Sequence, residues 1–243
     1  MHIIKLNAID STNSYLKELS AKQTVANFTV VVAENQTNGR GQRGANWEVE
    51  KGKNLTFSVL IKDVLVSAEE VFNLNVLVAV TLFQTFLNLK IPNLVIKWAN
   101  DIFADKKKIC GILIENQFKS ATEILSIVGI GINVNQENFI NLPLATSLKN
   151  CTNQEYNKDE VLLLFLNQFE NNLNLYKKKG ATYFWNLYHE NLFKKNKPMA
   201  FENADKVKFM GIIKQVMSNG LLQIELEDDK LQLFDIKELK MLY

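Results

Sequence analysis

The pattern of the chain changes after Pro198, and this change limits the folds that the chain can adopt. Before Pro198, strand-like apolar runs alternate with longer helical patterns. After it come only short strand-like runs, at 206–209, 211–216, 221–226 and 231–234, separated by turn signals such as Ser218-Asn219-Gly220. We therefore expect two domains over the 243 residues, a first at 1–195 and a second at 196–243 that forms a small β-barrel or sandwich.

Apolar periodicity predicts a mixture of strands and helices in the first domain. Strands are predicted at 3–6, 28–33, 55–61, 94–98, 109–114 and 124–132. Helices are predicted at 14–19, 68–87, 158–179 and 182–193, and the lysines before Gly180 are typical of a helix end. Two polar stretches, 34–54 and 133–157, are predicted to be loops. We therefore expect both strands and helices in this domain.

Composition places the chain among globular proteins and narrows its partners. Hydrophobic residues make up 47% and charged residues 22%, and the net charge of +2 gives no strong basic field for nucleic acid. The N-terminus has no signal-peptide pattern, and polar residues interrupt the apolar stretch 71–87, which predicts a buried helix rather than a membrane span. Cys110 and Cys151 have no C-x-x-C spacing, so we expect no disulfide. We expect a cytoplasmic protein without membrane or nucleic-acid partners.

The scarcity of histidine excludes several catalytic arrangements. Only His2 and His189 are present, so a histidine-based zinc site is excluded, and no Ser-His-Asp or Cys-His pair can be argued. What remains is a set of cations, amide-rich loops and one acid at a strand end, Asp101. This set suits phosphoryl or nucleotidyl transfer, in which positioning and charge neutralisation dominate.

The stretch NGRGQRGANW, from Asn38 to Trp47, holds the only two arginines among 28 basic residues, Arg40 and Arg43. Its glycines satisfy both a dinucleotide fingerprint and part of a phosphate loop. The first assignment fails because no helix opens after Gly44, and the second because Ala45-Asn46 replace the required Lys and Ser/Thr. A glycine-rich loop with two guanidinium groups is suited to cover an anionic ligand.

Two further constellations lie at strand ends. Lys97-Trp98-Ala99-Asn100-Asp101 is followed by Lys106 to Lys108, and Gly129-Ile130-Gly131-Ile132-Asn133 ends the strand predicted at 124–132. A strand end can present polar groups rigidly, which makes these segments candidate parts of a site. Simpler alternatives stay open: Asp101 as a turn or capping residue, the lysines as a solvated hairpin turn, and the glycines as close strand packing.

Together these motifs resemble those of the biotin protein ligases, in the same order and over essentially the whole chain. The matching segments are Ser11-Thr12-Asn13, Ala33-Glu34-x-Gln36-x-x-Gly39-Arg40-Gly41, Trp47, Lys97-Trp98-x-Asn100-Asp101, Lys108-x-x-Gly111-Ile112-Leu113 and Gly129-x-Gly131-Ile132-Asn133. The resemblance implies an α+β fold, in which a mixed β-sheet with packed helices forms a catalytic domain of the biotin/lipoate ligase type, related to class II aminoacyl-tRNA synthetases. It also implies a small, all-β, SH3-like C-terminal domain. It also implies two steps: ATP activates biotin to biotinyl-5′-AMP with release of pyrophosphate, and a lysine of a biotin carboxyl carrier domain then accepts the biotin.

The resemblance implies three groups of site residues, with Mg²⁺ as the expected metal. The residues implied to hold the ureido end of biotin are Ser11, Thr12 and Gln36, with the backbones of Gly111 and Gly129 close by. The catalytic residues would be Arg40 and Lys108, which neutralise the biotin carboxylate and the α-phosphate, and Asp101, which orients a lysine or helps to hold Mg²⁺. The residues implied to meet the adenylate are Trp47, Asn100 and Asn133. Further ligand-binding positions are Asn13, Gly39, Gly41, Arg43 and Gly131.

Two departures from the family pattern bear on the chemistry. Gln42 stands where many members have an Arg that is associated with retaining the reactive adenylate, so leakage of the intermediate, or a substitute contact from Arg43, is in question. Ala99 replaces the usual Pro between Trp98 and Asn100, which leaves the functional side chains present. Because Ser11 lies almost at the start of the chain, we expect a short form without a DNA-binding domain. A homodimer stays open.

Two other functions compete with biotin ligation. A lipoate or octanoate ligase shares the fold, but its glycine loop is expected to contain His, and no His lies near Gly39. A non-catalytic biotin-binding protein would tolerate the loss of Lys108 or Asp101, and both are present. The predicted function is therefore ATP-dependent biotin protein ligation, with a carrier domain as the protein partner.

Overall fold

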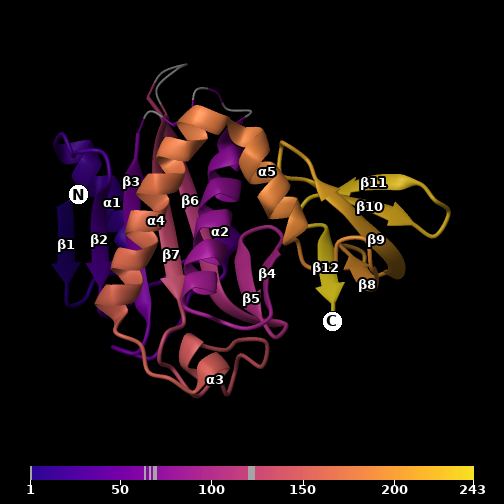
Figure 1. Cartoon of the computed structure of the whole chain (residues 1–243), viewed down its shortest axis with the longest axis horizontal. Helices are drawn as coiled ribbons and strands as arrows, with labels where there is room; N and C mark the ends of the chain where they lie inside the picture. Colours follow the sequence, from indigo (N-terminus) through magenta and orange to yellow (C-terminus); the bar gives the residue numbers. More distant parts are fainter. Residues whose placement is uncertain (1, 63, 66, 68–69, 120–123) are drawn as a thin grey trace.

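The computed structural model describes residues 2–62, 64–65, 67, 70–119 and 124–243, with the backbone but not the side chain of Arg43. Within these residues the chain forms two β-sheets, with helices packed on the larger one (Figure 1). The larger sheet has seven strands in the order β1-β2-β3-β7-β6-β5-β4, and the smaller has five in the order β11-β10-β9-β8-β12. Strands β1 and β2 are parallel and the other pairs are antiparallel. The predicted α+β class with a mixed sheet is confirmed.

The elements have the following bounds. The strands of the larger sheet are β1 (His2–Leu6), β2 (Thr29–Ala33), β3 (Leu55–Ile61), β4 (Leu94–Lys97), β5 (Asp101–Ala104), β6 (Lys107–Phe118) and β7 (Ile124–Ile132). The strands of the smaller sheet are β8 (Pro198–Asn203), β9 (Lys208–Val216), β10 (Leu222–Leu226), β11 (Leu231–Phe234) and β12 (Leu239–Leu242). The helices are α1 (Thr12–Lys22), α2 (Val71–Asn88), α3 (Leu148–Thr152), α4 (Lys158–Lys179) and α5 (Ala181–Glu190), with a short 3₁₀ turn, η1 (Gln42–Gly44).

Most predicted elements are present, and their differences from the prediction have physical reasons. Before Pro198, the helix α3, inside the loop predicted at 133–157, and the strand β5, in the hairpin before β6, were not predicted. Both are short and have no clear apolar period, which is the signal on which the prediction rests. The two strands predicted at 206–209 and 211–216 form the single strand β9. Gly211 lies inside it, where Ile224 packs so closely that a side chain would overlap. Strands β8 and β12 were not predicted.

The larger sheet separates two groups of buried side chains, because successive residues of a strand point to opposite faces. On β3, Phe57 and Val59 belong to the main core, which includes residues of α2, α4 and α5. The ring of Phe57 lies 5.4 Å from the ring of Phe165 on α4. Leu60, on the opposite face, belongs to a smaller cluster with Leu16 of α1. Three helices thus cover one face, in front of the sheet in Figure 1, and α1 covers part of the other.

Helix α2 lies in the centre of the main core. Among the described residues it is the one helix long and apolar enough to cross a membrane, and 72% of it is buried within the protein. Its Asn75 donates a hydrogen bond from Nδ2 to the carbonyl of Ala99 at 2.7 Å, so a polar residue of this helix also has a partner inside the fold. The prediction of a buried helix is confirmed.

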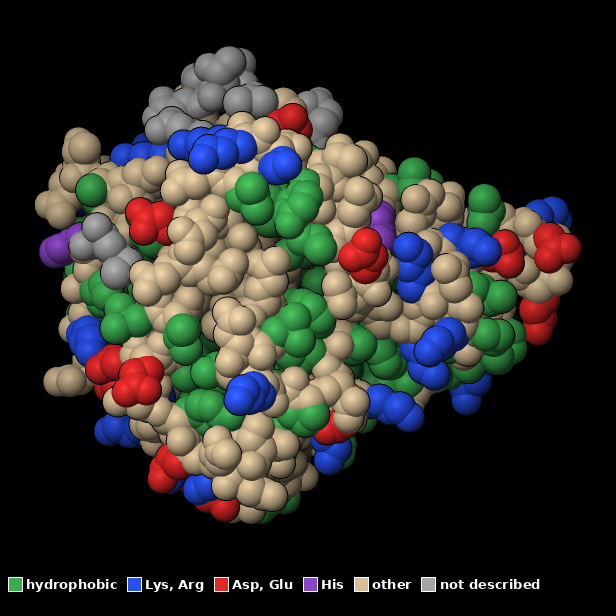
Figure 2. Space-filling view, viewed as in Figure 1, with side chains coloured by type: hydrophobic (Ala, Val, Ile, Leu, Met, Phe, Trp, Pro, Cys, Tyr) green, Lys and Arg blue, Asp and Glu red, His purple; other side chains and the backbone are tan. Residues whose placement is uncertain are grey.

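The smaller sheet packs against the larger part without a break in the core. Phe201 and Ile213 are fully buried and belong to the same apolar cluster as α2. Trp98 Nε1 donates to the carbonyl of Gly220 at 2.8 Å, which ties the turn before β5 to the turn before β10. Acidic and basic side chains are interspersed over both parts on the face that Figure 2 shows. The boundary between 195 and 196 and the SH3-like character stay predictions.

Candidate active site

Glycines form the floor of the candidate site. Gly129 and Gly131 on β7 and Gly111 on β6 lie on the sheet face opposite the main core, since their neighbours Ile130 and Ile112 belong to that core. The strand register places Gly131 beside Gly111. A Cβ at Gly129 would overlap the Asn13 amide, and one at Gly131 would overlap the Trp47 indole. The groups packed against these two glycines are side chains that also line the cavity, and not the backbone of a neighbouring strand, which was the alternative considered.

A cavity of about 160 Å³ lies above this floor. Thirteen of the predicted site residues line it: Ser11, Thr12, Asn13, Gln36, Arg40, Gly41, Trp47, Asn100, Asp101, Lys108, Gly111, Gly129 and Gly131. Gly39 does not line the cavity but packs against the Trp47 carbonyl inside the loop. Asn133 lies in an adjacent cavity, and the Arg43 side chain is outside the described part of the chain. The structure thus brings together segments that are far apart in the sequence.

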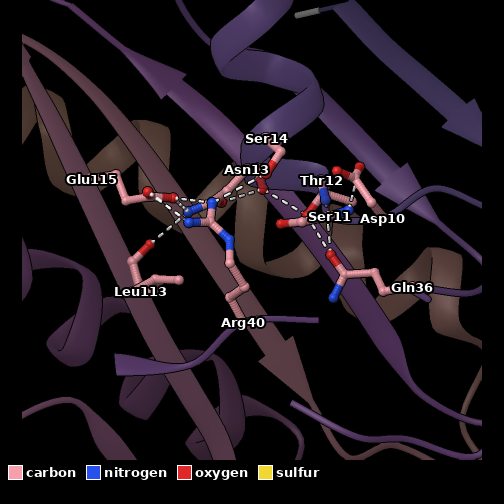
Figure 3. A network of polar contacts seen from close by, with 10 residues as sticks. Asp10, Ser11, Thr12, Asn13, Ser14, Gln36, Arg40, Leu113 and Glu115 are labelled. Atoms are coloured by element: carbon pink, nitrogen blue, oxygen red, sulfur yellow. Dashed lines mark hydrogen bonds and ion pairs between the residues drawn. The ribbon is translucent and has the colours of Figure 1, made fainter. Parts of the chain in front are cut away.

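Residues at the start of α1 line the cavity and take part in the network of polar contacts in Figure 3. Thr12 donates from its backbone N and from Oγ1 to Gln36 Oε1, at 2.8 and 3.1 Å. Ser58 Oγ lies 2.7 Å from Thr12 Oγ1 and 2.6 Å from Asn13 Oδ1, with one proton to share between them. Ser11 is the N-cap residue, yet its side chain makes no capping hydrogen bond within the described residues. Its buried hydroxyl therefore stays available to the cavity.

Arg40 is held by a carboxylate that the sequence reasoning missed. Its Nη1 and Nη2 donate to Glu115 Oε1 and Oε2 at 3.2 and 2.9 Å, and Nη2 also donates to Ser14 Oγ at 3.2 Å (Figure 3). Asn13 Nδ2 donates to Glu115 Oε2 at 2.7 Å and to the Leu113 carbonyl at 3.2 Å. Glu115 lies four residues after Gly111 on β6, a spacing that puts both on one face and could have indicated it.

The glycine-rich loop folds back over the cavity. Trp47 N donates to the Gly39 carbonyl at 2.9 Å, and Gly41 N donates to the Ala45 carbonyl at 2.6 Å, so the loop forms a narrow hairpin around η1. The Trp47 indole lies on Gly131 and Gly111, with Lys108 Nζ 5.4 Å from the centre of its ring. Trp47 Nε1 is buried and has no hydrogen-bond partner among the described residues. A buried indole N–H normally finds an acceptor, so this donor is available to an oxygen of a bound molecule.

Lys108 and Asp101, which also line the cavity, form an ion pair. Lys108 Nζ lies 2.7 Å from Asp101 Oδ1, and their side chains are 31% and 15% exposed. The pair spans the β5–β6 hairpin, whose turn contains Asp105 and Lys106 in the left-handed region, at φ 48° and 64°. The alternative of a solvated hairpin turn is therefore correct for the exposed Lys106 and wrong for Lys108. Asp101 starts a strand rather than serving as a turn residue.

A second cavity of about 360 Å³ adjoins the first. The two share four lining residues, Asn46, Trp47, Asp101 and Lys108. Asn133 lines only the second, and its Nδ2 donates to the Thr146 carbonyl at 3.0 Å. Its other walls come from residues 141–145 and from Tyr243 after β12. Trp47 and Lys108 thus stand between a polar cavity at the α1 end and a more apolar one.

Lys97 lies behind the Lys108–Asp101 pair. Its Nζ is 5.4 Å from the centre of the Phe103 ring and 5.8 Å from that of Tyr243. Burial lowers the pKa of Lys97, Asp101 opposes this effect, and Lys108 adds to it. Asn100 Nδ2 donates to the Ile112 carbonyl at 2.6 Å, which holds the segment before β5 against β6. Two cations, Lys97 and Lys108, therefore lie near one carboxylate, Asp101.

Residues 6–135 of the chain match the Biotin/lipoate A/B protein ligase family. The chain belongs to this family. Among proteins of known function, the "Bifunctional ligase/repressor BirA" of Bacillus spizizenii is 32% identical over 186 residues, which are 74% of this chain and 56% of that protein. The "Biotin--[acetyl-CoA-carboxylase] ligase" of Mycobacterium tuberculosis is 30% identical over 141 residues, 57% of this chain and 51% of that protein. The chain thus spans little more than half the length of these relatives.

Solved structures of this family match nearly the whole chain. The biotin protein ligase of Aquifex aeolicus in complex with biotin and ATP superposes with a TM-score of 0.79 at 27% identity, covering 99% of this chain and 98% of that one. The biotin protein ligase of Leishmania major in complex with biotinyl-5-AMP, at 18% identity and a TM-score of 0.67, shows the fold alone. The arrangement of both sheets is therefore that of biotin protein ligases.

Proposed function

We propose that the protein is an ATP-dependent biotin protein ligase. In the first step the biotin carboxylate attacks the α-phosphate of ATP, giving biotinyl-5′-AMP and pyrophosphate. In the second, the neutral ε-amine of a carrier-domain lysine attacks the acyl carbon, a C–N bond forms, and AMP leaves. One observation carries the proposal: a single cavity is lined by neutral hydrogen-bonding groups of Ser11, Thr12 and Gln36 and by two cations, Arg40 and Lys108, each paired with a carboxylate. The family and the names of the relatives support it.

The ureido end of biotin would bind at the start of α1. A ureido group has two N–H donors and one carbonyl acceptor, and it carries no charge. The Ser11 hydroxyl and the Gln36 amide line the cavity there, and Gln36 Nε2 stays available because Thr12 engages only Oε1. Neutral, buried hydrogen-bonding groups suit such a ligand, because a buried charge opposite it would be left unpaired.

Arg40 and Lys108 would overcome the main obstacle to the first step, the repulsion between two anions. Both side chains line the cavity. Each is held by a carboxylate, Glu115 for Arg40 and Asp101 for Lys108. Cations held in place before the substrates bind reduce the cost of reorganisation as charge develops on the α-phosphate. They would also hold the two reacting groups close together.

The adenylate would extend from the first cavity into the second. Trp47 stands between them, and its Nε1 could donate to a ligand oxygen. The second cavity has apolar walls, including Leu142 and Leu144, suited to a purine ring, and Asn133 at its edge offers a polar contact. Asn100 would hold the strand end that presents Asp101.

Mg²⁺ fits this site as an ion carried by ATP. Within the described ranges, no group of three or more His, Cys, Asp or Glu side chains could hold a metal ion alone. Mg²⁺ is usually bound by one or two carboxylates together with substrate phosphates. Asp101 lines both cavities and would hold it there. Bound Mg²⁺ would supply positive charge to the phosphates.

A biotin carboxyl carrier domain would be the acceptor in the second step. The Asp101 carboxylate, 15% exposed, could accept a hydrogen bond from the incoming lysine amine. The net charge of +2 supports a protein acceptor rather than nucleic acid as the partner.

Purified protein incubated with ATP, Mg²⁺ and biotin tests this function. We expect release of pyrophosphate that depends on biotin, and biotin attached to one lysine of an added carrier domain. Labelling with lipoate but not biotin would assign the protein to the lipoate branch of the family. Tight biotin binding without ATP turnover would instead indicate a binding protein.

A further inference from the structure

Glu115 connects three segments around the cavity. It lies on β6, its two oxygens accept from Arg40 of the glycine-rich loop, and one of them also accepts from Asn13 of α1. Asn13 in turn accepts from Ser58 on β3. These bonds join residues 75 and 102 positions apart in the sequence, so no local turn requires them.

The contact between Arg40 and Glu115 orients the guanidinium without using all of its donors. A guanidinium has five N–H groups. Glu115 accepts from one N–H of Nη1 and one N–H of Nη2, and Ser14 accepts from the second N–H of Nη2. Two of the five N–H groups, one on Nη1 and one on Nε, therefore have no partner among the described residues. Two parallel bonds to one carboxylate fix the plane of the group. The remaining donors can therefore meet an anion while that plane stays fixed.

We propose that Glu115 is a positioning residue, which fixes Arg40 over the cavity and fastens the 34–54 loop to β6 and α1. This inference rests on the proposed function only for its catalytic consequence. Its structural consequence, the fastening of the loop, holds whatever the substrate is. Glu115 is outside the residues that line the cavity, so it acts through Arg40 and Asn13.

The chain itself provides a selective probe of the loop. Arg40 and Arg43 are the only arginines in 243 residues, so an arginine-specific protease can cut only in this loop. In the ligand-free protein, Glu115→Gln removes the charge and one of the two strong acceptors. We expect cleavage after Arg40 to become about five- to tenfold faster, which is the change expected when a partly exposed bidentate ion pair is lost. Ser14→Ala, which removes one bond to Arg40, should act in the same direction with a smaller effect.

Glu225→Gln is the matched control. Glu225 is 29% exposed and pairs with Lys214 at 3.0 Å in the smaller sheet, whereas Glu115 is 25% exposed. The control should leave cleavage unchanged, and both variants should unfold within a few degrees of the wild type. Equal cleavage of wild type and Glu115→Gln would show that Glu115 does not fasten the loop.

Kinetics test the catalytic consequence. In pyrophosphate release, Glu115→Gln should lower kcat about tenfold with less than a threefold change in either KM, because Arg40 is present but no longer aligned. In an Arg40→Lys background, where no bidentate bond is possible, the Glu115→Gln change should lower kcat by less than about twofold. Equal losses in both backgrounds would overturn the positioning role. A wild type without biotin-dependent pyrophosphate release would refute the proposed function, while the cleavage experiment still decides whether Glu115 holds the loop.

Discussion

The Trp47 indole lies directly on Gly131, so closely that a Cβ at this position would overlap the indole ring. Gly131 lies in the middle of the sheet, paired with Thr56 of β3 and Gly111 of β6. A glycine in a strand is usually unfavourable by about 0.5–1 kcal/mol relative to alanine. The reason for glycine here is therefore the side chain above the strand and not the strand itself.

Gly131→Ala should displace Trp47 while the sheet stays intact. We expect the KM for ATP to rise about tenfold, because the indole can no longer lie between the two cavities, and the thermal unfolding midpoint to change by only a few degrees. The Trp47→Ala background is the control: without the indole, the added methyl group should cost little further activity. A loss of the same size in that background would mean that the methyl group blocks the ligand directly.

Lys108→Ala should suppress the first step far more than biotin binding. Among the described side chains, the substitution removes one of the two cations that line the cavity and takes away the ion-pair partner of Asp101. Loss of one charge-stabilising group typically costs about 10²–10³ in kcat. Biotin affinity, measured by calorimetry, should fall less than about tenfold because the ureido contacts remain. Lys106→Ala, in the exposed turn of the same hairpin, should keep wild-type rates, and an active Lys108→Ala enzyme would remove Lys108 from its proposed role.

Local sequence signals predicted the elements that depend on local chemistry. Helix α4 begins and ends where its apolar period and Gly180 indicate, and Asn157 caps it by accepting from the backbone of Asp159. Strand β7 has the predicted bounds, since it is long, β-branched and ends in the polar Asn133. The sequence also indicated the glycines of β7 as candidate parts of the site. The physical reason is that side chains which approach a strand closely leave no room for a Cβ.

Contacts between distant segments could not be predicted in this way. The partner of Arg40 depends on the register that puts Glu115 beside the loop, 75 residues away in the sequence. Ser58 reaches Thr12 and Asn13 only because β3 lies beside β7. Tyr243 reaches the second cavity through the packing of the smaller sheet. Each of these contacts is a property of strand order, which periodicity does not encode.

The contact of His189 with the smaller sheet should make stability depend on pH. His189 Nε2 lies 3.0 Å from Val216 N and 3.1 Å from the Val216 carbonyl, so the ring accepts from the first or donates to the second, depending on its tautomer. Burial lowers the pKa of His189 below its ordinary value of 6.5, while a hydrogen bond from the ring to the Val216 carbonyl opposes the shift and Lys195 adds to it. The folded protein therefore binds this proton less readily than the unfolded chain. The contribution of the neutral His189 ring to stability is therefore complete above pH 6.5, the ordinary pKa of the unfolded chain. It is lost as the pH falls through the lower pKa of His189 in the folded protein.

Thermal unfolding followed from about pH 8 to about pH 5 checks this sign. We expect His189→Gln, whose amide oxygen also accepts a hydrogen bond but does not titrate, to show a weaker loss of stability over this range. Comparison of the two proteins removes the contribution of the carboxylates, which both share. Parallel curves for wild type and variant would show that His189 does not couple the smaller sheet to protonation.

Gln42→Arg should reduce escape of the reactive intermediate. Gln42 lines the first cavity and also a groove next to Trp98 and Leu221, so its side chain stands on the wall between the cavity and the outside. A neutral amide cannot hold an adenylate phosphate by charge, whereas a guanidinium binds phosphate with two parallel bonds. We expect free biotinyl-5′-AMP, and stray labelling of an added bystander protein, to fall about five- to tenfold in the variant. The Gln42→Met variant, whose side chain is similar in size and neutral, should release as much free intermediate as the wild type. Equal release from all three proteins would show that position 42 does not retain the intermediate.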